Sequence, residues 1–220
     1  MNNLPKFKNQ KLFEHAFIHR SYLNETKEQL ESNERLEFLG DSILSFVMSD
    51  HLYMTYPEFK EGVLTNLRSL LVNTKTLALA AKELDLGRYL KLSKGEEESK
   101  GRENETLLAN SFEAFIGALY MDQGIGVVRM FLEQTLFPLA DGYVQTRQFK
   151  DPKSILQETV QAKKQHSPSY RVLSEEGPPH AKIFTMGVFV DEELMGKGVG
   201  KSKQEAEEAA AKTALEKISL

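Results

Sequence analysis

One stretch constrains the fold of this chain more than any other: residues 33–42, which read Asn-Glu-Arg-Leu-Glu-Phe-Leu-Gly-Asp-Ser. In a helix each residue turns by about 100°, so residues three and four apart share a face. The carboxylates of Glu34, Glu37 and Asp41 then lie within about 60° of one another. A separate apolar stripe can face a core, and it consists of Leu36, Leu39, Ile43 and Val47. The stretch therefore predicts a helix with one apolar side and a row of acids on another.

Three carboxylates this close repel one another unless a positive charge lies between them. Divalent cations such as Mg²⁺ are hard ions that prefer oxygen ligands, so one interpretation is a metal site. The other interpretation is a solvated acidic face, because runs of charge usually face water. The spacing alone leaves both interpretations open.

The same stretch resembles the signature of the ribonuclease III family, the endonucleases that cut double-stranded RNA. Residues 16–22, Ala-Phe-Ile-His-Arg-Ser-Tyr, resemble a second segment of that family. Residues 112–120, Phe-Glu-Ala-Phe-Ile-Gly-Ala-Leu-Tyr, resemble a third. With a C-terminal RNA-binding module, the resemblance extends over nearly the whole chain. Four ordered segments are far more specific than any single motif.

Composition limits the classes of protein to consider. A chain of 220 residues with 40% hydrophobic content can build one large core or two modest ones. It contains no cysteine, which excludes disulfides and thiolate chemistry and fits a reducing cytoplasm. No apolar run approaches the length of a membrane span, and the N-terminus lacks an apolar signal core. We therefore expect a mature cytoplasmic protein with no membrane partner.

The net charge of −4 does not by itself favour a nucleic-acid partner. The deficit lies in residues 1–151, which hold 18 basic and 22 acidic residues, whereas residues 152–220 hold ten of each. Binding of RNA must then come from local basic patches and not from overall charge.

Helical periodicity dominates the first two thirds of the chain, with no alternating strand pattern. Pro57 is expected to end the signature helix and Gly87 to cap a later one. Residues 93–105 are expected to form a charged loop. The expected helices span residues 6–22, 34–56, from 61 onwards, 75–86, 106–122 and 126–141. Residues 1–143 are thus predicted to be an all-α domain, and the resemblance implies that it is the endonuclease domain.

Residues 144–151 lose this periodicity and are predicted to be a linker. The remaining segment, 152–220, predicts a helix, three strands and a helix. The capping-box pattern Ser202-Lys203-Gln204-Glu205 marks the start of the last helix. The other elements are expected over residues 153–164, 170–174, 182–190 and 193–198. This order resembles a double-stranded RNA-binding domain, so the predicted fold is multidomain, an all-α domain followed by a small α+β domain.

A second helix carries the rest of the expected site. Asn110 and Glu113 are three residues apart and share a face, and facing helices often pool such side chains into a metal site. The resemblance implies that Glu37, Asp41, Asn110 and Glu113 hold Mg²⁺, or Mn²⁺ in its place, with Asp41 and Glu113 catalytic. It also implies auxiliary roles for Glu34 and Glu61. For Glu61 an equally good explanation is that an acid is favoured at a helix start.

Asn110 departs from the family pattern, which usually has aspartate at this position. An amide oxygen can ligate a hard cation but brings no charge. The departure is either natural variation or a change that disarms the enzyme. The predicted function is metal-dependent cleavage of double-stranded RNA to 5′-phosphate and 3′-hydroxyl ends, with processing of rRNA and mRNA precursors implied by the resemblance. The alternative is a protein of the same fold that binds duplex RNA with little or no cleavage. A purely structural helical dimer is disfavoured by the RNA module.

The resemblance also implies residues that contact RNA. Gln157, Glu158 and Gln161 would reach 2′-hydroxyls and base edges, although they can equally be ordinary surface. His180, in a rigid loop between strands, is either a hairpin residue or a minor-groove probe. The start of the last helix is expected to bind phosphate through ammonium charge and the helix end, with the residues Lys201, Ser202 and Lys203.

Two aromatic side chains near the motifs have alternative interpretations. Phe38 lies beside the acidic row, so it belongs either to an edge of the core or to a contact with another subunit. The resemblance favours the second interpretation, in a two-fold homodimer. His19 has no second histidine at ligand spacing, which favours a structural role.

Overall fold

The computed structural model describes residues 4–146, 152–163, 165–178 and 181–218. The chain divides into two compact units, Met1–Phe149 and Lys150–Leu220. In the described ranges, no helix is both long enough and apolar enough to cross a membrane. The separation into a larger helical unit and a smaller mixed unit agrees with the predicted fold class.

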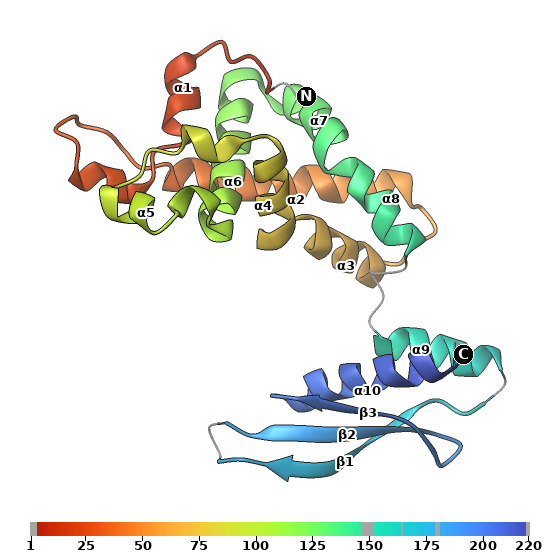
Figure 1. The fold of residues 1–220 in the computed structure, drawn as a ribbon. Helices are drawn as coiled ribbons and strands as arrows, with labels where there is room; N and C mark the ends of the chain where they lie inside the picture. Colours follow the sequence, from red (N-terminus) through yellow and green to blue (C-terminus); the bar gives the residue numbers. More distant parts are fainter. Residues whose placement is uncertain (1–3, 147–151, 164, 179–180, 219–220) are drawn as a thin grey trace. The chain divides into compact units, whose positions relative to one another are not determined.

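In the part of the first unit that the structure describes, the regular elements are helices and helical turns, with one isolated β-bridge between Ile18 and Lys91 (Figure 1). Its longest helix, α2, begins and ends within one residue of the predicted signature helix. The helices in the described part of this unit are α1 (Gln10–His15), α2 (Glu34–Thr55), α3 (Glu61–Leu71), α4 (Thr74–Glu83), α5 (Lys94–Glu98), α6 (Glu105–Gln123), α7 (Ile125–Thr135) and α8 (Phe137–Gln145). Three 3₁₀ turns join them: η1 (Arg20–Asn24), η2 (Leu86–Tyr89) and η3 (Gly101–Glu103).

The core of this unit is built around α6, which is buried along most of its length. It crosses α2 near the middle of the unit (Figure 1), and the two helices form the most extensive helix–helix contact of the fold. A Cβ atom added at Gly40 would lie 1.8 Å from the carbonyl oxygen of Glu113, and one at Gly117 would lie 2.2 Å from that of Leu36. The backbones therefore touch at this crossing, which any side chain would prevent.

The predicted helix over 6–22 is wrong in extent. Only Gln10–His15 is α-helical, with the Asn9 side chain accepting from the amides of Lys11 and Leu12. Beyond it the backbone pairs with a distant segment: the Lys91 amide donates to the Phe17 carbonyl at 2.8 Å. These tertiary hydrogen bonds satisfy the backbone as well as a helix does, so local periodicity did not decide the structure.

Four further expectations are corrected. The helix expected over 126–141 is two helices, because the chain bends at Leu136 and Pro138 lies in the first turn of α8. Gly87 does not cap α4, which ends at Glu83; it lies in η2, where a Cβ would be 2.5 Å from the carbonyl oxygen of Arg102. The charged loop expected over 93–105 contains α5 and η3.

The helix α8 also includes the first two residues of the expected linker, and residues 147–151 of that linker lie outside the described ranges.

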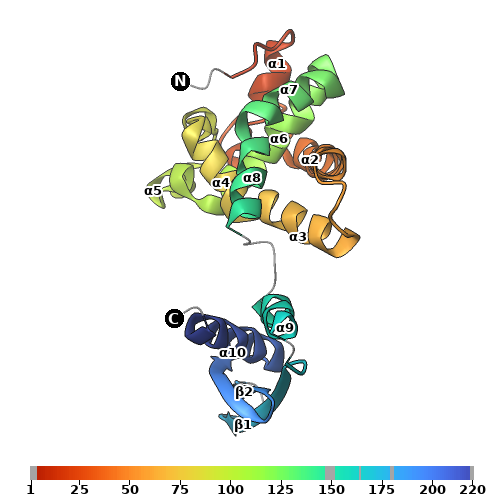
Figure 2. The same ribbon diagram turned by 90° about the vertical axis from the view of Figure 1, so that its right-hand side faces the viewer.

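The second unit is a three-stranded antiparallel sheet in the order β1-β2-β3, with both helices on one face (Figure 2). Along β2 the alternate residues Met186, Val188 and Val190 are buried against the helices, as the period of two predicted. The elements are α9 (Pro152–Ala162), β1 (Ser169–Glu176), β2 (Ile183–Val190), β3 (Glu193–Gly200) and α10 (Lys203–Ile218). This is the predicted α-β-β-β-α order, with β1 and β3 slightly longer than expected.

The close crossing of α2 and α6 generates a stability prediction. Gly40→Ala places a methyl group against backbone atoms that cannot rotate away. We expect this overpacking to destabilise the helical unit by about 1–3 kcal/mol. Urea unfolding followed by far-UV circular dichroism measures it. Gly142→Ala is the matched control, since a Cβ there meets nothing within 4 Å and alanine is the better helix former. Equal unfolding midpoints for the two variants would contradict the proposed contact.

Candidate functional site

The α2–α6 crossing brings the predicted acidic residues together. Glu37 and Asp41 lie one turn apart on α2, on either side of Gly40, and the Glu113 carbonyl oxygen is the atom nearest to Gly40 from α6. Asn110 lies one turn before Glu113 on the same helix. The side chains of Glu37, Asn110 and Glu113 are half-buried, and that of Asp41 is exposed. Two helices thus place all four predicted side chains at one crossing.

The electrostatics of these groups show that they form one cluster. Burial, and then the negative charges of Asp41 and Glu37, together raise the pKa of Glu113 to about 7. The pKa of Glu37 is also raised, first by burial and then by repulsion from Glu34. The Asn110 side chain hydrogen-bonds to Glu37 and lowers the pKa of Glu37. Glu34, predicted as auxiliary, is therefore part of the same electrostatic cluster.

Arg20 is a cationic neighbour that the sequence analysis did not assign. Its guanidinium lies 3.7 Å from the Glu34 carboxylate and lowers the pKa of Glu37. Its presence in the family-like segment 16–22 was the available signal. Next to it, the His19 imidazole contacts the Ser21 hydroxyl at 2.8 Å and caps η1, in agreement with a structural role. Both residues line a hollow of about 290 Å³ that also includes Glu37 and Asn110.

The donor chemistry of the cluster fits a hard divalent cation. All of its ligating atoms are carboxylate or amide oxygens, which Mg²⁺ and related ions prefer, and the raised pKa values record negative charge without full compensation. Within the described ranges, no three His, Asp or Glu side chains already converge into a metal site. The residues on α2 and α6 have the right donor atoms, but binding an ion would require their side chains to rotate toward it.

The structure does not bring Glu61 into this cluster. It lies in the first turn of α3, is exposed, and accepts a hydrogen bond from the Thr65 hydroxyl at 3.1 Å. It is not among the groups that shift the pKa of Glu37 or Glu113. The helix-start explanation accounts for its position within this chain, and its auxiliary role stays a prediction.

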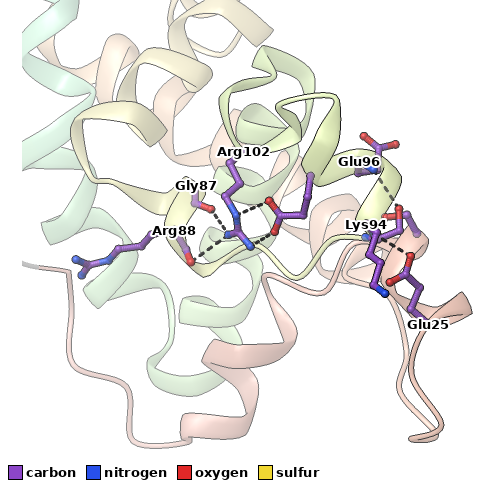
Figure 3. Close-up of polar contacts among 9 residues, drawn as sticks. Glu25, Gly87, Arg88, Lys94, Glu96 and Arg102 are labelled. Carbon is purple, nitrogen blue, oxygen red and sulfur yellow. Dashed lines mark hydrogen bonds and ion pairs between the residues drawn. The ribbon is translucent and has the colours of Figure 1, made fainter.

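The segment before α6 is held in place by polar contacts (Figure 3). The Arg102 guanidinium donates to the carbonyls of Gly87 at 2.8 Å and Arg88 at 3.1 Å, and it pairs with the Glu97 carboxylate. The Asn104 side chain then caps α6 by accepting from the amides of Thr106 and Leu107. These contacts fix the start of the helix that carries Asn110 and Glu113.

Phe38 belongs to an exposed apolar surface. Its side chain is 76% exposed, and Phe46, two turns further along α2, is 63% exposed. Beside them lies a hollow of about 740 Å³, lined by Ser42, Ile43, Phe46, Tyr120, Met121, Gly124 and Ile125. The sequence analysis missed this hollow, although the spacing of Phe38, Ser42 and Phe46 along one helix side was visible. Phe38 is therefore not part of the core.

On the second unit, the expected RNA contacts lie on α9 and at the start of α10. Gln157, Glu158 and Gln161 are all exposed on α9. Ser202 accepts a hydrogen bond from the Glu205 amide at 3.1 Å, and Glu205 accepts one from the Lys201 amide at 2.7 Å, so the predicted capping box forms with a shifted partner. Lys201 and Lys203 are exposed at this helix start. His180 lies outside the described residues.

Comparisons with known proteins agree with both units. A family profile described as Ribonuclease-III-like matches residues 9–139, and one described as double-stranded RNA binding motif matches residues 152–218. Ribonuclease 3 of Enterococcus faecalis is 45% identical over 213 residues, which cover 96% of this chain and 92% of that protein. Ribonuclease 3 of Listeria monocytogenes is 44% identical over 215 residues, covering 96% and 93%.

Two solved structures are also similar to this chain. The nuclease domain of ribonuclease III from Campylobacter jejuni has 35% identity and a TM-score of 0.54, covering 59% of this chain and 84% of that one. Dicer from Pichia stipitis has 29% identity and a TM-score of 0.51, covering 98% of each chain. Nothing in these comparisons favours a protein that binds duplex RNA without cutting it. Because family profiles match both units and the relatives match almost end to end, the chain belongs to the ribonuclease III family and is an endoribonuclease specific for double-stranded RNA.

Proposed function

We propose that this enzyme uses Mg²⁺, or Mn²⁺ in its place, held by Glu37, Asp41, Asn110 and Glu113. The observation that supports this most strongly is the coupling across the helix crossing, where Asp41 and Glu37 raise the pKa of Glu113. When bound, the ion would activate water and neutralise charge on the phosphate. The products would carry 5′-phosphate and 3′-hydroxyl ends, and the substrates would include rRNA and mRNA precursors in the cytoplasm.

The proposed role of each side chain in the site follows from how far it is exposed to solvent. Glu37, Asn110 and Glu113 are half-buried on two packed helices, so their backbones are held in place while their side-chain oxygens turn toward the ion. Asp41 is exposed, and its carboxylate can orient a water molecule for attack or accept a proton from it. Arg20 pairs with Glu34 and also lowers the pKa of Glu37, so it partly offsets the negative charge beside the crossing. The exposed residues of α9 and the α10 start hold the duplex.

Asn110 generates the test of this site. A site with one fewer negative charge holds Mg²⁺ more loosely, because ligand charge helps to set affinity for hard cations. Asn110→Asp should therefore lower the Mg²⁺ concentration needed for half-maximal cleavage, with RNA affinity in calcium or EDTA nearly unchanged. A magnesium titration of single-turnover cleavage measures this. Glu113→Gln is the control and should abolish cleavage in either background while binding persists. If Asn110→Asp leaves the titration curve in place, Asn110 does not ligate the ion.

The active enzyme is proposed to be a homodimer built on the exposed side of α2. Phe38 projects into solvent beside the 740 Å³ hollow, and a second copy could cover both. A solved nuclease domain of the Campylobacter jejuni enzyme, which is 34% identical with a TM-score of 0.56 over 60% of this chain and 92% of that one, is described as flexible in a region involved in dimer formation. Two-fold pairing of the same surface would bring two cutting sites to one duplex.

Light scattering tests the dimer. The parent should have the mass of two chains at micromolar concentration, and Phe38→Ala should shift the mass toward one chain, because it removes a large apolar group from the contact. Leu79→Ala is the matched control, since Leu79 is also exposed but lies on α4, away from the hollow. A parent protein that is monomeric at micromolar concentration would show that the dimer proposal is wrong.

Lys201 and Lys203 are proposed to set RNA affinity through phosphate charge. The double variant Lys201→Ala/Lys203→Ala should bind duplex RNA more weakly, and its salt dependence should be shallower by about one unit for each phosphate that the variant no longer neutralises. Sequence preference should change little, because phosphate contacts do not read bases. Fluorescence anisotropy across a salt series measures both quantities. Lys212→Ala/Lys217→Ala, which removes the same charge from the other end of α10, is the control. A double variant with the parent's salt slope would refute this role.

A further inference from the structure

One carboxylate of the second unit contacts two lysines from different elements. Glu175, near the end of β1, has one oxygen 2.9 Å from the Lys182 ammonium and the other 3.6 Å from the Lys203 ammonium. Lys182 directly precedes β2, and Lys203 is the first residue of α10. The pairing therefore connects the strand that precedes the β1–β2 loop with the proposed phosphate-binding helix start.

The sheet register explains why these three groups meet. Glu175 is paired across the sheet with Phe184, and Phe184 is paired with Gly200 on β3. Gly200 lets α10 approach closely, since a Cβ there would lie 2.5 Å from the Ala206 amide nitrogen. The Lys203 ammonium then lies 5.8 Å over the Phe184 ring, on the side of Glu175. Backbone pairing and helix packing thus fix the position of the carboxylate relative to Lys203.

The contact contributes little to the fold itself. The Glu175 side chain is 33% exposed and those of Lys182 and Lys203 are more exposed, so water screens the pairs. Exposed ion pairs add little stability. The ion pairs do affect the ionisation of Glu175. Hydrogen bonding to Lys182 and the charges of both lysines lower the pKa of Glu175 and favour its ionised form. The negative charge of Glu175 therefore lies beside the Lys203 ammonium at neutral pH.

We propose that Glu175 is a counter-charge that restrains the affinity of this domain for duplex RNA. The inference rests on the proposed role of Lys203 in phosphate binding. A phosphate that approaches Lys203 meets a carboxylate within a few ångströms and has to displace it from the ammonium. Two lysines that are already paired also release fewer counterions when RNA binds. The restraint weakens the hold on the duplex and lets cut product leave sooner.

Glu175→Gln removes the charge and keeps the size of the side chain. Because opposite charges about 4 Å apart in water attract by about 1 kcal/mol, releasing Lys203 from Glu175 should raise duplex affinity about fivefold, with a steeper salt dependence. Multiple-turnover cleavage should slow through product release, while single-turnover cleavage stays the same. Glu175→Asp keeps the charge and should retain affinity close to that of the parent.

The matched control is Glu176→Gln. Glu176 is the next residue of β1, carries the same charge, is exposed, and points to the opposite face of the sheet. Anisotropy titrations in EDTA compare the full-length variants, after circular dichroism shows that each is folded. The proposal predicts that Glu175→Gln binds more tightly than both the parent and Glu176→Gln. Equal effects of the two glutamine variants, or weaker binding by Glu175→Gln, would overturn it.

A double-mutant cycle separates this inference from the proposal on which it rests. In the Lys182→Ala/Lys203→Ala background, Glu175→Gln should have little of its effect left. If the lysine variant alone binds RNA as the parent does, the proposed phosphate contact fails. If the lysine variant binds more weakly but Glu175→Gln keeps its full effect in both backgrounds, the phosphate contact stands and the counter-charge acting through these lysines is refuted.

Discussion

The backbone contact between α2 and α6 is the constraint on which the rest of the helical unit depends. Gly40 and Gly117 let the two helices approach until a carbonyl of each occupies the space of a side chain on the other. The acids lie within one turn of that contact, so their separation is set by backbone packing and not by flexible loops. The buried residues of α6, among them Phe112 and Phe115, then hold the crossing against the core.

The short distance between the acids at the α2–α6 crossing has an electrostatic cost. The pKa of Glu113 is raised from 4.5 to about 7, so the folded chain binds this proton more tightly than the unfolded chain does. The ionised carboxylate therefore lowers stability progressively as pH rises through that interval. Asn110 limits the cost, because it hydrogen-bonds to Glu37 without adding a charge. Because Asn110 is neutral, the site also attracts a cation less strongly. Asn110 therefore lowers the repulsion in the metal-free protein and, at the same time, the proposed affinity for metal.

Local patterns in the sequence correctly predicted those features of the fold that short-range interactions determine. The helix α2, the shared face of Asn110 and Glu113, and the alternation along β2 follow from short-range periodicity. The length of the first helix did not, because the Lys91 amide donates to the Phe17 carbonyl and the Lys91 carbonyl accepts from the His19 amide, across more than seventy residues. The contacts of Glu175 were equally hidden, since Lys203 lies far along the chain and only the sheet register brings the two together.

Charge placement explains how a chain with a net charge of −4 can act on a polyanion. In the helical unit four acids, Glu34, Glu37, Asp41 and Glu113, form one cluster at the crossing, where a cation of the proposed kind would reverse the local sign. In the second unit the basic and acidic residues are equal in number, so binding depends on which lysines are available. Lys203 is exposed at a helix start but shares its charge with Glu175. If Lys203 binds phosphate as proposed, affinity there depends on the balance between two nearby charges, whose distance is fixed by the strand pairing.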